Sequence, residues 1–209
     1  MKTSLLVSLL FVSLSVFAQD TITLHHKAYS TTYSKSKCYP VKVEWWVTKN
    51  GLTCDIKVKR GDKFMPDPKL SKETNLQEHY VGTGFDRGHN FPAADAVCDQ
   101  VANEESFYFS NMTAQYPALN RGDWKSLELY TRELTGKYDS VKVWCGSIGE
   151  ERKVGIVSIP KQCWKVLYIK KTNEWIAYLF NNNTSKADGI ANNKIDVAEI
   201  TKLTGFQFK

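Results

Sequence analysis

The sequence predicts one α+β domain with a central antiparallel sheet and a few helices. Apolar, strand-like runs outnumber helical ones, and neither a linker nor an internal repeat divides the chain. The 209 residues, 42% of them hydrophobic and 24% charged, suit one domain that buries about 70% of its unfolded surface. This composition excludes collagen-like, low-complexity and wholly disordered chains.

The first part of the domain contains strand-like runs and a loop. Val41–Val47 and Leu52–Lys59 flank Asn50-Gly51, which predicts a hairpin because both turn residues tolerate positive φ. Residues 60–76 are expected to form a loop because they contain two prolines. The apolar segment Phe107–Ser110 is expected to be a short buried strand.

The second part contains the best helix. Over Asn120–Leu134, apolar and small side chains recur at helical spacing, and Gly136 is expected to end the helix in the C′ position. Four strands and a short terminal helix are expected after it. They are Val141–Cys145, Val154–Ile159, Trp164–Lys170, Trp175–Phe180 and the helix Ala198–Thr204.

Residues 1–18 have the pattern of a signal peptide. Lys2 supplies the positive charge, residues 5–17 form the apolar run, and Val16-Phe17-Ala18 fits a cleavage site. The run is about 13 residues, shorter than the roughly 20 that span a bilayer. We therefore expect cleavage near Ala18, a mature domain over residues 19–209, secretion or a periplasmic location, and no stable membrane association. The alternative is an uncleaved N-terminal anchor.

Export permits disulfides, and the chain has five cysteines. Five cannot all pair within one chain, and the sequence does not determine the connectivity. We expect a Cys145–Cys163 bond, because both residues lie at the ends of strand-like runs separated by one connection. The alternative is that some cysteines are buried thiols. The chain has no CxxC pair, so a structural zinc site is not expected.

The segment Asp86-Arg87-Gly88-His89 contains groups suited to phosphodiester hydrolysis. That reaction needs a base for water and positive charge for the developing phosphorus centre. His89 is a candidate base, because a neutral imidazole is available near pH 7. Arg87 and the upstream Arg60 present planar guanidinium groups for phosphate oxygens. The net charge of +6 permits a polyanionic partner without requiring one.

Asn120 and Glu128 are candidate metal-binding residues. Eight residues of α-helix correspond to about 12 Å of rise and about 80° of rotation, so both cannot directly ligate one ion. A bridging water resolves this difficulty, and Mg²⁺ keeps several waters and few protein ligands. The alternative for Asn120 is a helix cap.

Together, these segments resemble the sugar-non-specific DNA/RNA endonuclease family, the secreted ββα-metal nucleases. The resemblance extends from about Tyr39 to the C-terminus. It rests on Asp86-Arg87-Gly88-His89, Ser110-Asn111-Met112, Asn120-Arg121-Gly122-Asp123-Trp124, Leu127-Glu128 and the upstream Arg60, Phe64 and Asp67-Pro68.

The resemblance implies an endonuclease that acts on DNA and RNA with little sequence specificity, leaves 5′-phosphate ends and has a ββα-metal finger at its active site. His89 would be the general base, and Arg87 and Arg60 would stabilise phosphate charge. Asn120 would be the only direct protein ligand of Mg²⁺, with Mn²⁺ as the alternative ion. Glu128 would act on this ion through a water.

Two other functions remain open at the level of sequence: a nucleic-acid-binding module without turnover, and a hydrolase of another phosphodiester. Asp86 is expected to order the hairpin or to pair with a nearby cation. Two departures from the family pattern, Asn90-Phe91 and Thr113-Ala114-Gln115, put substrate fit in doubt more than activity. The sequence predicts neither the preference between DNA and RNA nor the oligomeric state.

Overall fold

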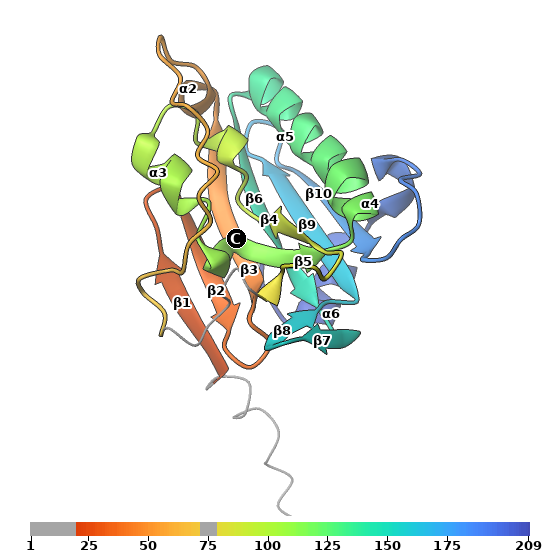
Figure 1. Cartoon of the computed structure of the whole chain (residues 1–209). Helices are drawn as coiled ribbons and strands as arrows, with labels where there is room; N and C mark the ends of the chain where they lie inside the picture. Colours follow the sequence, from red (N-terminus) through yellow and green to blue (C-terminus); the bar gives the residue numbers. More distant parts are fainter. Residues whose placement is uncertain (1–19, 72–78) are drawn as a thin grey trace, which may run out of the picture.

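The computed structural model describes residues 20–71 and 79–209, so the expected signal peptide lies outside the described residues. Figure 1 shows a large twisted sheet crossed by one long helix. The sheet has seven strands in the order β1-β2-β3-β6-β9-β10-β11, and every neighbouring pair is antiparallel. The strands are β1 (Thr21–His25), β2 (Tyr29–Ser34), β3 (Tyr39–Thr48), β6 (Ser140–Ile148), β9 (Gln162–Ile169), β10 (Glu174–Asn181) and β11 (Lys194–Ile195). The predicted α+β class with a central antiparallel sheet is confirmed.

Both faces of the sheet are covered by helices. Successive side chains along each strand point to opposite faces, so each strand contributes to two apolar clusters. On β6, Val143 and Cys145 belong to the main core, whereas Trp144 between them packs in a second cluster. The main core also contains Leu127 of helix α5 (Lys125–Tyr138), and the second cluster contains Ile200 of helix α6 (Val197–Thr204). The α5 face carries the candidate functional site.

A small ββα unit lies on that face. Strands β4 (Asp86–His89) and β5 (Met112–Gln115) form an antiparallel pair. The chain then enters α4 (Pro117–Leu119), the π-helical turn η4 (Asn120–Trp124) and the helix α5 (Lys125–Tyr138), as Figure 1 shows. The expected ββα finger is therefore present.

The helix expected over Asn120–Leu134 begins and ends at other residues in the structure. Gly122 has non-helical dihedral angles inside η4, so the segment from Asn120 is set apart from the regular α5. The expectation that Gly136 ends the helix is wrong, because α5 continues to Tyr138. Asp139, with φ of 71°, takes the left-handed position instead.

The hairpin expected around Asn50-Gly51 is wrong. After β3, Thr48 Oγ1 accepts a hydrogen bond from Gly51 N and caps a short helix, α2 (Lys49–Leu52). Strand β3 already has β2 and β6 as neighbours, so no edge is left for the segment that follows. Residues 53–64 therefore run as an extended loop, and residues 60–71 form the expected loop.

The buried strand expected at Phe107–Ser110 is also wrong. The residues are largely buried, but they lead from α3 (Gln100–Glu105) into a 3-10 turn, η3 (Phe109–Asn111), and the strand begins at Met112. The apolar run forms a buried turn, and a run this short does not distinguish a buried turn from a buried strand.

The remaining expected strands and the terminal helix are present. The run expected at Val154–Ile159 is a hairpin of β7 (Arg152–Val154) and β8 (Val157–Ile159). Two 3-10 turns, η2 (Ala93–Asp95) and η5 (Ile190–Asn193), complete the described elements. No helix within residues 20–71 and 79–209 is long and apolar enough to cross a membrane.

The expected Cys145–Cys163 disulfide is wrong. The bond joins Cys54 to Cys98, and the other three cysteines are buried thiols, which was the stated alternative. Cys145 and Cys163 lie on neighbouring strands but out of register, because Cys145 pairs with Lys165 and Cys163 pairs with Ser147.

Candidate active site

Strand β4 presents Asp86, Arg87 and His89 beside the start of α5. Gly88 is fully buried between them, and a Cβ at this position would overlap the side chain of Gln115 on β5. The glycine is therefore required by the close approach of a neighbouring side chain rather than by an unusual backbone angle. This close packing fixes the position of β4 against β5, and with it the position of His89.

The imidazole of His89 lies between two phenylalanines. Its ring centroid is 5.6 Å from that of Phe64 and 4.9 Å from that of Phe107. The indole Nε1 of Trp124 donates to the His89 carbonyl at 3.0 Å, which ties the end of β4 to the start of α5. Within the described residues, Nε2 of His89 is buried and has no hydrogen-bond partner.

The electrostatic surroundings keep His89 neutral. Burial lowers the pKa of His89 to about 3, and the positive charges of Arg60 and Arg87 act in the same direction. A hydrogen bond to the backbone of Arg87 acts in the opposite direction and is weaker. A neutral imidazole with an unpartnered nitrogen has the form that a general base needs.

Arg87 and Arg60 each lie over one of the two phenylalanine rings that contact the histidine. The Arg87 guanidinium lies 4.0 Å from the centroid of the Phe64 ring, and that of Arg60 lies 5.2 Å from the centroid of Phe107. Arg60 also contacts Asp62 at 3.5 Å, but its side chain is 58% exposed, so this pair is weak. Both guanidinium groups are partly open to solvent and available to an anion.

Asn120 faces Asp86. Its Nδ2 donates to Asp86 Oδ2 at 2.8 Å, and Arg121 donates to both oxygens of Asp86 at 2.8 and 2.7 Å. These hydrogen bonds and the charges of Arg121 and Arg87 hold the pKa of Asp86 below its usual value, although burial opposes them. The expectation that Asp86 pairs with a nearby cation is confirmed.

The donor set at Asn120 fits a hard divalent cation. Asp86 engages the amide nitrogen, so the amide oxygen is the end turned away from it, and neutral oxygen ligands suit Mg²⁺. In the part of the chain that the structure describes, no group of three or more His, Cys, Asp or Glu side chains could hold a metal ion. An ion at Asn120 would therefore need solvent ligands to complete its coordination.

Glu128 lies one helical turn after Trp124, and several charged groups with little exposure act on it. Burial raises the pKa of Glu128 to about 7, and Asp95 acts in the same direction, while Lys165, Arg132 and Arg60 oppose it. The charge of Arg60 therefore acts on the pKa of both Glu128 and His89.

Three charged residues at this site were not among the site residues predicted from the sequence. Arg132 donates to Asp95 at 2.9 Å, Asp95 also accepts from the Trp45 indole at 2.9 Å, and Lys165 Nζ lies 4.1 Å from the Trp124 ring centroid. Arg132 follows Glu128 by one helical turn, a spacing that could have identified it. No local signal marks Lys165, whose position depends on the pairing of β6 with β9.

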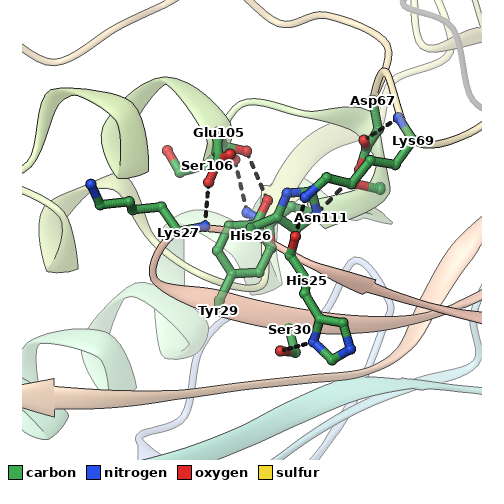
Figure 2. Close-up of polar contacts among 11 residues, drawn as sticks. His25, His26, Lys27, Tyr29, Ser30, Asp67, Lys69, Glu105, Ser106 and Asn111 are labelled. Atoms are coloured by element: carbon green, nitrogen blue, oxygen red, sulfur yellow. Dashed lines mark hydrogen bonds and ion pairs between the residues drawn. The ribbon is translucent and has the colours of Figure 1, made fainter.

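The loop that carries Arg60 and Phe64 is anchored at its far end by the segment between β1 and β2. Figure 2 shows His26 directed at Asp67 and Lys69 reaching the carbonyl of His25. His26 Nε2 lies 3.1 Å from Asp67 Oδ2 with both side chains fully buried, and Ser110 donates to the same oxygen at 2.5 Å. These contacts fix the loop relative to β1, β2 and η3.

Comparisons with known proteins agree with this arrangement. A family model described as DNA/RNA non-specific endonuclease matches residues 12–209. Nuclease C1 of Cunninghamella echinulata var. echinulata is 31% identical over 88% of this chain and 81% of its own length. A nuclease of Nostoc sp. is 30% identical over 86% of this chain and 70% of its own length.

Among solved structures, EndoG in a complex with the inhibitor EndoGI has a similar fold. The TM-score is 0.82, with 24% identity over 89% of this chain and 84% of that chain. At this level of identity the likeness concerns the fold, and it supports the ββα arrangement described above.

Proposed function

The chain belongs to the DNA/RNA non-specific endonuclease family, and we propose that His89 is the general base with which it hydrolyses phosphodiester bonds in both DNA and RNA. The observation that carries this proposal is the imidazole of His89, which contacts the two phenylalanine rings over which Arg87 and Arg60 lie. Recognition through phosphates carries no direct sequence information, so little sequence preference is expected.

In this proposal, Arg87 and Arg60 hold the oxygens of the scissile phosphate. Nε2 of His89 removes a proton from the attacking water, and the new P–O bond forms. The P–O3′ bond breaks with its electron pair on the 3′ oxygen, which takes a proton from solvent, and the products are a 3′-hydroxyl and a 5′-phosphate. Because Nε2 is covered, neighbouring side chains must move before water reaches it.

A divalent ion, Mg²⁺ or alternatively Mn²⁺, would be held by the amide oxygen of Asn120, with Glu128 acting through solvent. The family is metal-dependent, and the donor set supports a hard cation. When bound, such an ion supplies positive charge that stabilises the leaving oxygen. The protein's own contribution is to orient the amide through Asp86 and to supply a carboxylate at Glu128.

We also propose that the protein is exported after cleavage near Ala18. The support is the sequence pattern of residues 1–18. The test is the N-terminal sequence of the protein recovered from the culture medium or periplasm, which should begin near Gln19. An N-terminus at Met1 in the cell-associated fraction would contradict export.

The catalytic proposal is tested by incubating the protein with supercoiled DNA, single-stranded RNA and a small chromogenic diester, each with Mg²⁺ and with EDTA. Cleavage of both nucleic acids, abolished by EDTA, is expected. His89→Ala should lower the rate by at least about 100-fold while the protein stays folded. Binding without cleavage would favour the binding module, and cleavage of the small diester alone would favour another phosphodiesterase.

A further inference from the structure

Two phenylalanines with no assigned chemical role contact the three groups that the proposed function places around the phosphate, namely His89 and the two arginines. The Phe64 ring lies 4.0 Å below the Arg87 guanidinium and 5.6 Å from the His89 ring. The Phe107 ring lies 5.2 Å from the Arg60 guanidinium and 4.9 Å from the same histidine. The two phenylalanines also contact each other, with centroids 5.2 Å apart in an edge-to-face arrangement.

The backbone holds this aromatic pair in place although 43 positions separate its members. Met65, next to Phe64, forms an isolated parallel bridge with Tyr108, next to Phe107. Met65 N donates to Phe107 O at 3.3 Å, and Phe109 N donates to Met65 O at 3.0 Å. Asp67, bound to buried His26, fixes the same loop two residues further on. The aromatic pair is therefore part of the rigid scaffold.

The physical consequence concerns orientation. An aromatic face attracts a guanidinium group and keeps it planar against the ring, while the N–H edge remains free for a phosphate. A long arginine side chain otherwise loses considerable rotamer freedom when it binds an anion. A ring that holds the guanidinium before the substrate arrives reduces this loss.

We propose that Phe64 and Phe107 are positioning residues, each of which aligns one arginine with the phosphate while both orient the imidazole of His89. Phe64 acts through Arg87, and Phe107 acts through Arg60. This inference rests on the proposed nuclease function and adds a division of labour to it, because the two arginines are positioned independently by different rings.

The first test replaces each ring by an aliphatic side chain. Phe64→Leu and Phe107→Leu should each lower kcat on DNA by about 3- to 30-fold, because the arginine stack is lost while an apolar side chain remains. Phe64→Tyr, which keeps the ring, should retain activity within about twofold. Phe208→Leu is the matched control, because Phe208 is a partly buried ring that contacts Trp144 and Trp164 in the cluster on the other face of the sheet. It should keep the wild-type kcat at a similar loss of thermal stability.

The second test is a pair of double-mutant cycles. If Phe64 acts through Arg87, Phe64→Leu should have a smaller effect in an Arg87→Ala background than in the wild type, with only its effect through His89 remaining, and Phe107→Leu should behave likewise with Arg60→Ala. The crossed pairs, Phe64→Leu with Arg60→Ala and Phe107→Leu with Arg87→Ala, should be closer to additive. Equal additivity in all four cycles would overturn the proposal.

A folding control accompanies both tests, and the results distinguish failure of the proposed function from failure of the aromatic inference. Thermal unfolding is measured for every variant, and Phe107→Met replaces Phe107→Leu if the latter does not fold, since methionine fills irregular space. If the wild-type protein itself has no nuclease activity, the proposed function fails. If the wild type is active and both leucine variants match it in kcat, the aromatic inference fails alone.

Discussion

The side-chain amide of Asn120 donates to Oδ2 of Asp86 at 2.8 Å, and this bond fixes which end of the amide faces away from β4. We predict that Asp86→Ala raises the Mg²⁺ concentration needed for half-maximal activity by about 10- to 100-fold, because partners that orient a metal ligand have effects of this size. The measurement is an Mg²⁺ titration of DNA cleavage. Asn120→Ala should have a larger effect in the same direction.

Arg121→Ala is the control for this prediction. It removes the ion pair with Asp86 but leaves the bond between Asp86 and Asn120 in place. The Arg121 side chain is 71% exposed, so the pair adds little to stability, and the Mg²⁺ titration should change less than in Asp86→Ala. Equal shifts in the two variants would show that the ion pair between Asp86 and Arg121, rather than the bond between Asp86 and Asn120, sets the metal requirement.

Most of the predicted site residues lie in short continuous segments, and the structure brings these segments together. Asp86 to His89 form one strand, and Asn120 and Glu128 lie on the turn and helix that follow its partner strand. The regular period of Leu127, Thr131 and Leu134 correctly predicted the buried face of α5. Local spacing was enough for the buried face of the helix, whereas the roles of the site residues rest on the resemblance to the family.

Features that depend on distant segments could not be predicted in this way. The turn signal at Asn50-Gly51 was overridden because β2 and β6 already flank β3. Phe107 reaches His89 only because the loop at Met65 pairs with Tyr108. The bond between Cys54 and Cys98 likewise joins two loops, and nothing in the local sequence around either cysteine indicates the other.

Gly88→Ala should destabilise the protein. The new methyl group would overlap the side chain of Gln115, which is itself buried. Overpacking of this kind costs about 1–3 kcal/mol, measured as the free energy of unfolding in urea. The cost should be smaller when Gly88→Ala is introduced into a Gln115→Ala background, because the obstacle is then removed. An unchanged cost in that background would mean that the backbone of β4, rather than contact with Gln115, requires glycine.

Reduction of the disulfide should lower stability. Cys54 and Cys98 are separated by 44 positions, and closing a loop of this length in the unfolded chain corresponds to about 4 kcal/mol. A thiol reductant should therefore lower the urea midpoint of the wild-type protein. Cys54→Ser/Cys98→Ser should start at the lower value and should not respond to reductant. If the double variant still responds, one of the buried thiols forms another bond under the conditions used.

The acid dependence of stability should carry a contribution from His89. Its pKa is about 3 in the folded protein and 6.5 in the unfolded chain, so only the unfolded chain binds this proton between those values. The contribution to stability is therefore complete above about pH 6.5 and is lost as pH falls toward 3, with a slope of at most about 1.4 kcal/mol per pH unit. His89→Gln removes the titrating group, so its free energy of unfolding should fall less steeply with acid than that of the wild type. Urea unfolding at pH 7, 6, 5 and 4 in the presence of a chelator measures this difference, and parallel curves for the two proteins would mean that His89 titrates normally in the folded state.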